Sequence, residues 1–307
     1  MTHENQSAAD YHHQGTVHFE LERYDEAIAS FDRSLEISPE NYDGWNTRGL
    51  ALVGLGRHEE AIGSYDKALE IHPNYSDVWY NRGSALSNLG RYDEAVTSFD
   101  NVLAIEPDFA YAWNYHGIFL GRLGRYEEAL ESFDRALEIN PNMSEVWFNR
   151  GVSLGHLEYN VGAVESYKRA LETDPDFEGA WSNMGVSLFK LARYEEALEC
   201  FGKALTADSG FFEAWTNQGL AFLVTKRYAE ALESFDKAIA IYPNDNSTWR
   251  CRGEALYQLD QDDDALKSFD KALEINPRDP EAFDGRQLIM IEKGAPPWGN
   301  GKHNSSK

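Results

Sequence analysis

The chain has 307 residues, with 52 acidic against 28 basic side chains and a formal net charge of −24. This charge opposes contact with a nucleic-acid backbone, and no apolar run approaches the ~18 residues that a membrane span requires. The first ten residues lack a signal-peptide pattern, and the two cysteines form no recurrent disulfide or metal-binding pattern. We therefore expect a cytoplasmic protein that uses no cofactor or metal and binds neither nucleic acid nor membrane.

The tryptophans mark an internal repeat. From Trp45 to Trp249 seven of them follow at intervals of 34 residues, and Tyr11 occupies the same place one interval earlier. A fixed period of this kind indicates one supersecondary unit stacked many times. With the tryptophan numbered as position 4, the eight repeats are residues 8–41, 42–75, 76–109, 110–143, 144–177, 178–211, 212–245 and 246–279.

Four further positions recur along these repeats. Position 8 is always glycine, position 20 always alanine, position 24 always Phe or Tyr, and position 32 is proline in every repeat except at Ser209. Glycine inside a helix costs about 1 kcal/mol relative to alanine, so position 8 indicates that two helices approach closely there. We expect the alanine to lie against that glycine, the aromatic rings to fill the space between helices, and the proline to end the second helix.

This pattern resembles the tetratricopeptide repeat family across residues 8–279. The resemblance implies an all-α fold, a right-handed α-solenoid superhelix of helix-turn-helix repeats with a concave groove lined by the first helix of each repeat. Residues 280–293 look like one more first helix, which would cap the array. Residues 1–7 and 294–307 carry no periodicity, and we predict that they are disordered.

No pattern in the sequence points to catalysis. Gly56, Gly90 and Gly124 share position 15 between the two helices, where glycine readily ends a helix in the left-handed conformation, and they form no phosphate-binding loop. The histidines, His116 and His156 among them, share no repeat position, and we interpret them as incidental. We therefore expect that the protein is not an enzyme.

Asparagine recurs at position 6, which the family fold places in the groove. The side-chain amide offers a donor and an acceptor together, as a peptide backbone does. The row resembles the asparagine ladder in the repeat domain of O-linked N-acetylglucosamine transferases, which implies binding to the main chain of an extended peptide. The alternative is that these residues hydrogen-bond between neighbouring repeats. The residues are Asn81, Asn149, Asn183 and Asn217.

Position 9 adds apolar side chains to the same helices, and we predict that they bind apolar side chains of the peptide. These residues are Ile118, Val152, Val186 and Leu220. At position 12, Gly121 and Gly155 remove side chains from the middle of the groove, which predicts a hinge or a widened pocket. Arginine at position 7, as in Arg48, predicts an ion pair between repeats. Asparagine never occupies position 9, so the family's carboxylate clamp for chaperone C-termini is not expected.

The predicted function is a non-catalytic protein-protein interaction scaffold. Its groove would bind an extended peptide segment of a partner, either basic or apolar. Two alternatives stay open at this point: a self-assembling structural module and a non-catalytic subunit of an enzyme complex. A repeat array serves so many processes that its fold does not name the partner.

Overall fold

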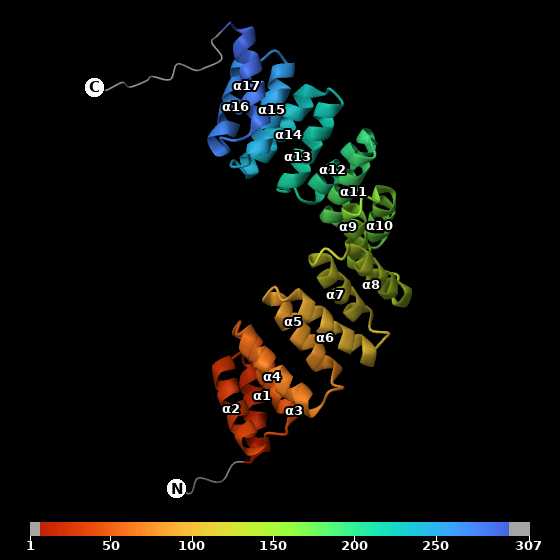
Figure 1. Cartoon of the computed structure of the whole chain (residues 1–307), viewed down its shortest axis with the longest axis vertical. Helices are drawn as coiled ribbons and strands as arrows, with labels where there is room; N and C mark the ends of the chain where they lie inside the picture. Colours follow the sequence, from red (N-terminus) through yellow and green to blue (C-terminus); the bar gives the residue numbers. More distant parts are fainter. Residues whose placement is uncertain (1–6, 295–307) are drawn as a thin grey trace, which may run out of the picture. The chain divides into compact units, whose positions relative to one another are not determined.

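A computed structural model describes residues 7–294 and divides the chain into two compact units, Met1–Leu157 and Glu158–Lys307. Each unit consists of consecutive antiparallel helix pairs (Figure 1). Within residues 7–294 there is no strand, so the predicted all-α solenoid of helix-turn-helix repeats is confirmed. The boundary falls inside repeat five, between its two helices. Of the residues predicted to be disordered, 1–7 and 294–307, all but Ser7 and Gly294 lie outside the described residues. The prediction is wrong for Ser7, whose side chain caps α1 by accepting a hydrogen bond from the backbone N–H of Asp10.

The first unit contains α1 (Ala8–Glu20), α2 (Tyr24–Ile37), α3 (Tyr42–Gly54), α4 (His58–Ile71), α5 (Ser76–Asn88), α6 (Tyr92–Ile105), α7 (Ala110–Arg122), α8 (Tyr126–Ile139) and α9 (Ser144–His156). The second unit contains α10 (Asn160–Thr173), α11 (Glu178–Lys190), α12 (Tyr194–Ala207), α13 (Phe212–Val224), α14 (Tyr228–Ile241), α15 (Asn246–Gln258), α16 (Asp262–Ile275) and α17 (Pro280–Glu292). Odd-numbered helices up to α15 are thus the first helices of the repeats. None of the helices in residues 7–294 is long and apolar enough to span a bilayer.

Repeat two shows how local sequence sets the helix ends. The side chain of Asn41 caps α3 by accepting a hydrogen bond from the backbone N–H of Gly44 at 3.1 Å. Gly56 then takes a φ of 72°, the left-handed conformation expected for this turn. In the first turn of α4, Arg57 donates two hydrogen bonds to Glu60, and these bonds lower the pKa of that carboxyl group.

The glycine at position 8 makes room for an aromatic ring. A Cβ atom placed on Gly83 would lie 2.6 Å from the Phe99 ring, and one on Gly117 would lie 2.6 Å from the Phe133 ring. The atoms nearest to such a Cβ belong to the ring at position 24, so this ring, in addition to the small alanine expected beside it, is what requires glycine at position 8. These rings are almost completely buried, so they cannot move aside for a methyl group.

Each tryptophan at position 4 forms a hydrogen bond to the turn that precedes its repeat. The indole Nε1 of Trp45 donates to the carbonyl oxygen of Pro39 at 2.8 Å. Trp215 donates in the same way to Ser209, the one residue that replaces proline, because the acceptor is a backbone carbonyl that every residue carries. The remaining pairs are Trp79–Pro73, Trp113–Pro107, Trp147–Pro141, Trp181–Pro175 and Trp249–Pro243.

The last helix caps the array, as predicted. Helix α17 packs against α15 and α16 and buries Ile289 completely. Its N-cap, Asp279, accepts hydrogen bonds from the backbone N–H groups of Glu281 and Ala282 and from Asn246 Nδ2 at 2.8 Å. The helix therefore covers the apolar face that the final repeat would otherwise expose.

Candidate functional site

A polar clasp joins successive repeats through position 7. Arg48 Nε donates to Asp32 of the preceding repeat at 2.6 Å, and its Nη1 donates to Ser64 of its own repeat at 2.7 Å. The predicted ion pair between repeats is confirmed here. The same ion pair recurs as Arg82–Asp66, Arg150–Asp134, Arg252–Asp236 and Arg286–Asp270. These arginines link neighbouring repeats and are not available to a ligand.

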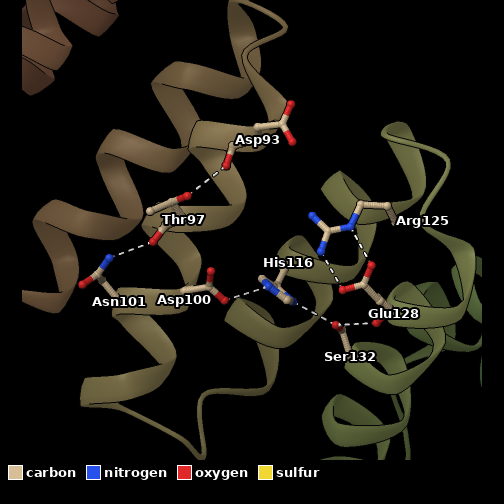
Figure 2. A network of polar contacts seen from close by, with 8 residues as sticks. All are labelled: Asp93, Thr97, Asp100, Asn101, His116, Arg125, Glu128 and Ser132. Carbon is tan, nitrogen blue, oxygen red and sulfur yellow. Dashed lines mark hydrogen bonds and ion pairs between the residues drawn. The ribbon is translucent and has the colours of Figure 1, made fainter.

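In repeat four the clasp contains histidine in place of arginine (Figure 2). His116 Nε2 lies 3.0 Å from Asp100 Oδ1, and Nδ1 lies 2.9 Å from Ser132 Oγ. The Ser132 hydroxyl also lies within hydrogen-bond distance of the carbonyl oxygen of Glu128. The two ring nitrogens thus reach the same two kinds of partner, a carboxylate and a serine, that the arginine nitrogens reach elsewhere. The interpretation of His116 as incidental is wrong, and its place at position 7 was the signal that could have revealed its role.

The order of Asp100, His116 and Ser132 superficially matches a hydrolase triad. However, Ser132 is only 2% exposed and already donates its hydroxyl hydrogen to Glu128. It also lies in the middle of α8, where backbone N–H groups are bonded along the helix and cannot form an oxyanion hole. The same position carries a serine bonded to an arginine in other repeats. We therefore assign this contact to the structural clasp.

One cavity of the first unit lies between α7 and α9 and is bounded by α8, and we call it the repeat-four pocket. It has a volume of about 520 Å³, and three of the predicted groove residues, Ile118, Asn149 and Val152, line it. The rings of Phe133 and Phe148 add aromatic surface. Position 9 of one repeat thus shares a cavity with positions 6 and 9 of the next.

The repeat-four pocket exists because position 12 is glycine there. A Cβ atom on Gly121 would meet no atom within 4 Å. In repeat six the same position holds Phe189, whose ring packs edge-on against Tyr194 with 5.3 Å between ring centres. Tyr126 corresponds to Tyr194 but has no such ring beside it within its own repeat. The glycines at position 12 predicted either a hinge or a widened pocket, and this cavity is the widened pocket.

A second cavity, the repeat-six pocket, occupies the equivalent place in the second unit. It brings together Val186, Asn217 and Leu220, which are three more of the predicted residues, with Phe189 and Phe201. Its volume is only about 40 Å³, because the ring of Phe189 takes the space that Gly121 leaves open in repeat four. The two pockets therefore share a position in the repeat and differ in capacity.

The four asparagines divide into two kinds. Asn81 donates to Asn46 of the preceding repeat at 3.2 Å, and Asn149 donates to Asn114 at the same distance. These two residues therefore bond between repeats, as the alternative interpretation proposed. Asn183 and Asn217 are half-buried, and their amides make no side-chain hydrogen bond within the described part of the chain. Asn81 lies in neither pocket, and Asn183 is likewise not among the lining residues.

The repeat-four pocket has a cationic side chain and no acidic one in its lining, although the protein as a whole is acidic. Arg122 and His156, both at position 13, line its edge, and no carboxylate does. Arg122 forms no ion pair with any described residue, whereas the His156 ring stacks on Tyr126 with centres 4.5 Å apart. The sequence analysis assigned no role to these two residues, although they share a position in the repeat. Among residues 7–294 no cluster of side chains could hold a metal ion.

Comparison with known proteins identifies the repeats. Family models described as tetratricopeptide repeat match residues 13–76, 80–144, 116–177, 182–246 and 247–279. No curated protein matches the chain.

Solved structures share this architecture. YrrB, described as a tetratricopeptide repeat protein with an unusual peptide-binding site, is 26% identical with a TM-score of 0.54, over 60% of this chain and 95% of its own. MamA is 23% identical with a TM-score of 0.51, over 53% and 95%. A tetratricopeptide repeat protein from Parabacteroides merdae is 18% identical with a TM-score of 0.60, over 82% and 100%.

Proposed function

Because this chain belongs to the tetratricopeptide repeat family, we propose that it is a non-catalytic interaction scaffold that holds an extended segment of a partner protein along its odd-numbered helices. One observation carries this proposal. Position 9 of one repeat meets positions 6 and 9 of the next in a cavity, and this occurs once in each unit. An apolar side chain of the partner would enter the cavity beside an amide that can bond its backbone.

The amides of Asn183 and Asn217 are the groups best suited to the partner's main chain. They are half-buried and have no side-chain partner in the described residues, so a peptide group would satisfy them without breaking an existing bond. Asn81 and Asn149 already donate between repeats, although their remaining acceptor capacity can still meet a peptide N–H group. The peptide-binding site described for YrrB agrees with this use of the fold.

A peptide-display selection against paired variants tests the proposal. Asn183→Ala with Asn217→Ala is expected to weaken binding of the selected peptides by about thirtyfold, since each of the two lost hydrogen bonds contributes about 1 kcal/mol. The melting temperature should stay nearly unchanged. The matched control, Asn81→Ala, lies outside both pockets and should leave binding unchanged while it lowers the melting temperature by removing one bond between repeats. Peptides that bind all three proteins equally, or a selection that yields none, would contradict the proposal.

Self-association is a second candidate, favoured by apolar side chains exposed on the terminal helices. Leu21 is 57% exposed at the end of α1, and Ile291 is 60% exposed on α17. Exposed apolar surface of this kind can pair with a second copy. Sedimentation at rising concentration would reveal it, and a constant monomer mass up to high concentration would exclude it. A role as the non-catalytic subunit of an enzyme complex stays a prediction.

A further inference from the structure

We propose that the repeat-four pocket binds an aromatic side chain of the partner together with a carboxylate next to it. This inference rests on the proposed function and deepens it by naming the chemistry of the bound segment. The aromatic ring would occupy the space above Gly121, and the carboxylate would pair with Arg122 at the edge of the pocket.

The aromatic preference follows from the chain's own repeats. In repeat one Phe19 packs edge-on against Tyr24, with ring centres 5.6 Å apart, and in repeat six Phe189 packs in the same way against Tyr194. These phenylalanines stand at position 12, where repeat four has Gly121. Edge-to-face packing of two rings is favourable beyond the area that it buries. A phenylalanine from the partner would thus restore, between molecules, a contact that other repeats make internally.

The walls of the pocket suit such a ring. The cavity of about 520 Å³ falls within the size range of small-ligand sites, roughly 300 to 1,000 Å³. Ile118 and Val152 form its aliphatic side and Phe133 its aromatic side. By contrast, the repeat-six pocket of about 40 Å³ cannot admit a side chain of this size. The inference therefore concerns repeat four alone.

The carboxylate preference follows from charge. The chain carries a net charge of −24, yet the lining of this pocket has a guanidinium and an imidazole and no carboxylate. The arginines of the clasp are paired with acidic neighbours, and so are several arginines at helix ends, such as Arg91 with Glu94 and Arg125 with Glu128. Arg122 has no such partner in the described residues and is exposed at the edge of the cavity. An acidic residue of the partner would supply the missing counter-charge, whereas a lysine there would be repelled.

The first test fills the repeat-four pocket with a phenylalanine ring introduced at position 121. A random 12-residue phage-displayed peptide library is selected against the full chain, and the binders are then measured against Gly121→Phe and Gly121→Ala. Both substitutions replace a helical glycine whose Cβ meets no atom, so neither should unfold α7. We expect Gly121→Phe to weaken binding by about tenfold or more, the equivalent of excluding one buried aromatic side chain. Gly121→Ala, which leaves most of the cavity open, should retain binding within about threefold.

The second test separates charge from shape. Selected sequences should contain Phe, Tyr or Trp beside Asp or Glu. Synthetic peptides in which that acidic residue is changed to Lys should bind the native chain about fivefold more weakly. In the Arg122→Gln variant, the acidic and the Lys peptides should bind equally well. Binders that ignore Gly121→Phe, or that carry basic residues beside the ring, would overturn the inference. If those binders nevertheless lose affinity for the chain with Asn183→Ala and Asn217→Ala, the proposed function holds and only the inference about the repeat-four pocket fails. A selection that yields no binder overturns both.

Discussion

At the scale of single residues, glycine has opposite roles in this chain, and its surroundings decide which one applies. Gly83 lies where a methyl group would meet the buried Phe99 ring at 2.6 Å, so only glycine lets α5 approach α6 closely enough. Gly63 is exposed on α4, and a Cβ atom there would meet nothing within 4 Å. The first glycine is required by packing, and the second only lowers helix propensity.

Two alanine substitutions should therefore change stability in opposite directions. Gly83→Ala is expected to lower the free energy of unfolding by about 2 kcal/mol, because the buried ring has no room to move. Gly63→Ala should raise the free energy of unfolding by about 1 kcal/mol through helix propensity. Urea denaturation followed by circular dichroism measures both values. A stabilising effect of Gly83→Ala would contradict the close approach.

At the scale of elements, several pairs of neighbouring repeats are joined by the same clasp, and between repeats three and four a histidine takes the place of its arginine. His116 reaches Asp100 with one ring nitrogen and Ser132 with the other (Figure 2). Arginine satisfies the equivalent partners in repeats two and three at any ordinary pH. Histidine at position 116 therefore keeps the geometry of the clasp but lacks the permanent charge of arginine.

Restoring arginine should strengthen this junction. His116→Arg is expected to raise the free energy of unfolding by about 1 kcal/mol, the usual order for a partly buried charged hydrogen bond. The gain should vanish in an Asp100→Asn background, where the charged partner is missing, and a double-mutant cycle measures this coupling. Equal effects of His116→Arg in both backgrounds would show that the carboxylate does not hold position 116.

At the scale of the whole molecule, the interior contains weak acids that burial keeps protonated. Burial raises the pKa of Cys200 to about 12 and that of Cys251 to about 11, and it raises the pKa of Tyr65 and Tyr167 above the usual range of phenols. Because the folded-state pKa values exceed the unfolded ones, the stability linked to these groups is fully present below the unfolded pKa. It is lost as pH rises through the interval between the two values.

The protein should therefore unfold more easily in alkaline solution. The unfolded pKa values are about 8.5 for cysteine and about 10 for tyrosine, so the loss should begin near pH 9. Each thiol alone should contribute on the order of 2 kcal/mol of destabilisation by pH 10.5. Urea midpoints at pH 7, 9 and 10.5 measure the effect. Cys200→Ser, which introduces the residue that other repeats carry at that position, should reduce the fall, and an unchanged midpoint at pH 10.5 would refute the expectation.

Much of this architecture could be predicted from the residues alone, because it depends on a pattern of residues that recurs along the repeats. The period places the helix pairs, the left-handed glycines such as Gly56 mark the turns, and arginine at position 7 indicates the ion pair to the preceding repeat. The capping helix follows from the same register in α17. Local propensity and a repeated position suffice for these features, since each copy has the same neighbours.

Other features required atomic positions, because they depend on which side chains from different helices share a space. Only the structure shows that the position-24 ring faces Gly83, and that Asn81 bonds to Asn46 although 35 residues separate them. The repeat-four pocket likewise depends on the space that Gly121 leaves among residues of three helices, and on the absence of carboxylates from its lining. A periodic sequence predicts what is common to the repeats, whereas the candidate site arises where one repeat departs from them and its neighbours do not fill the gap.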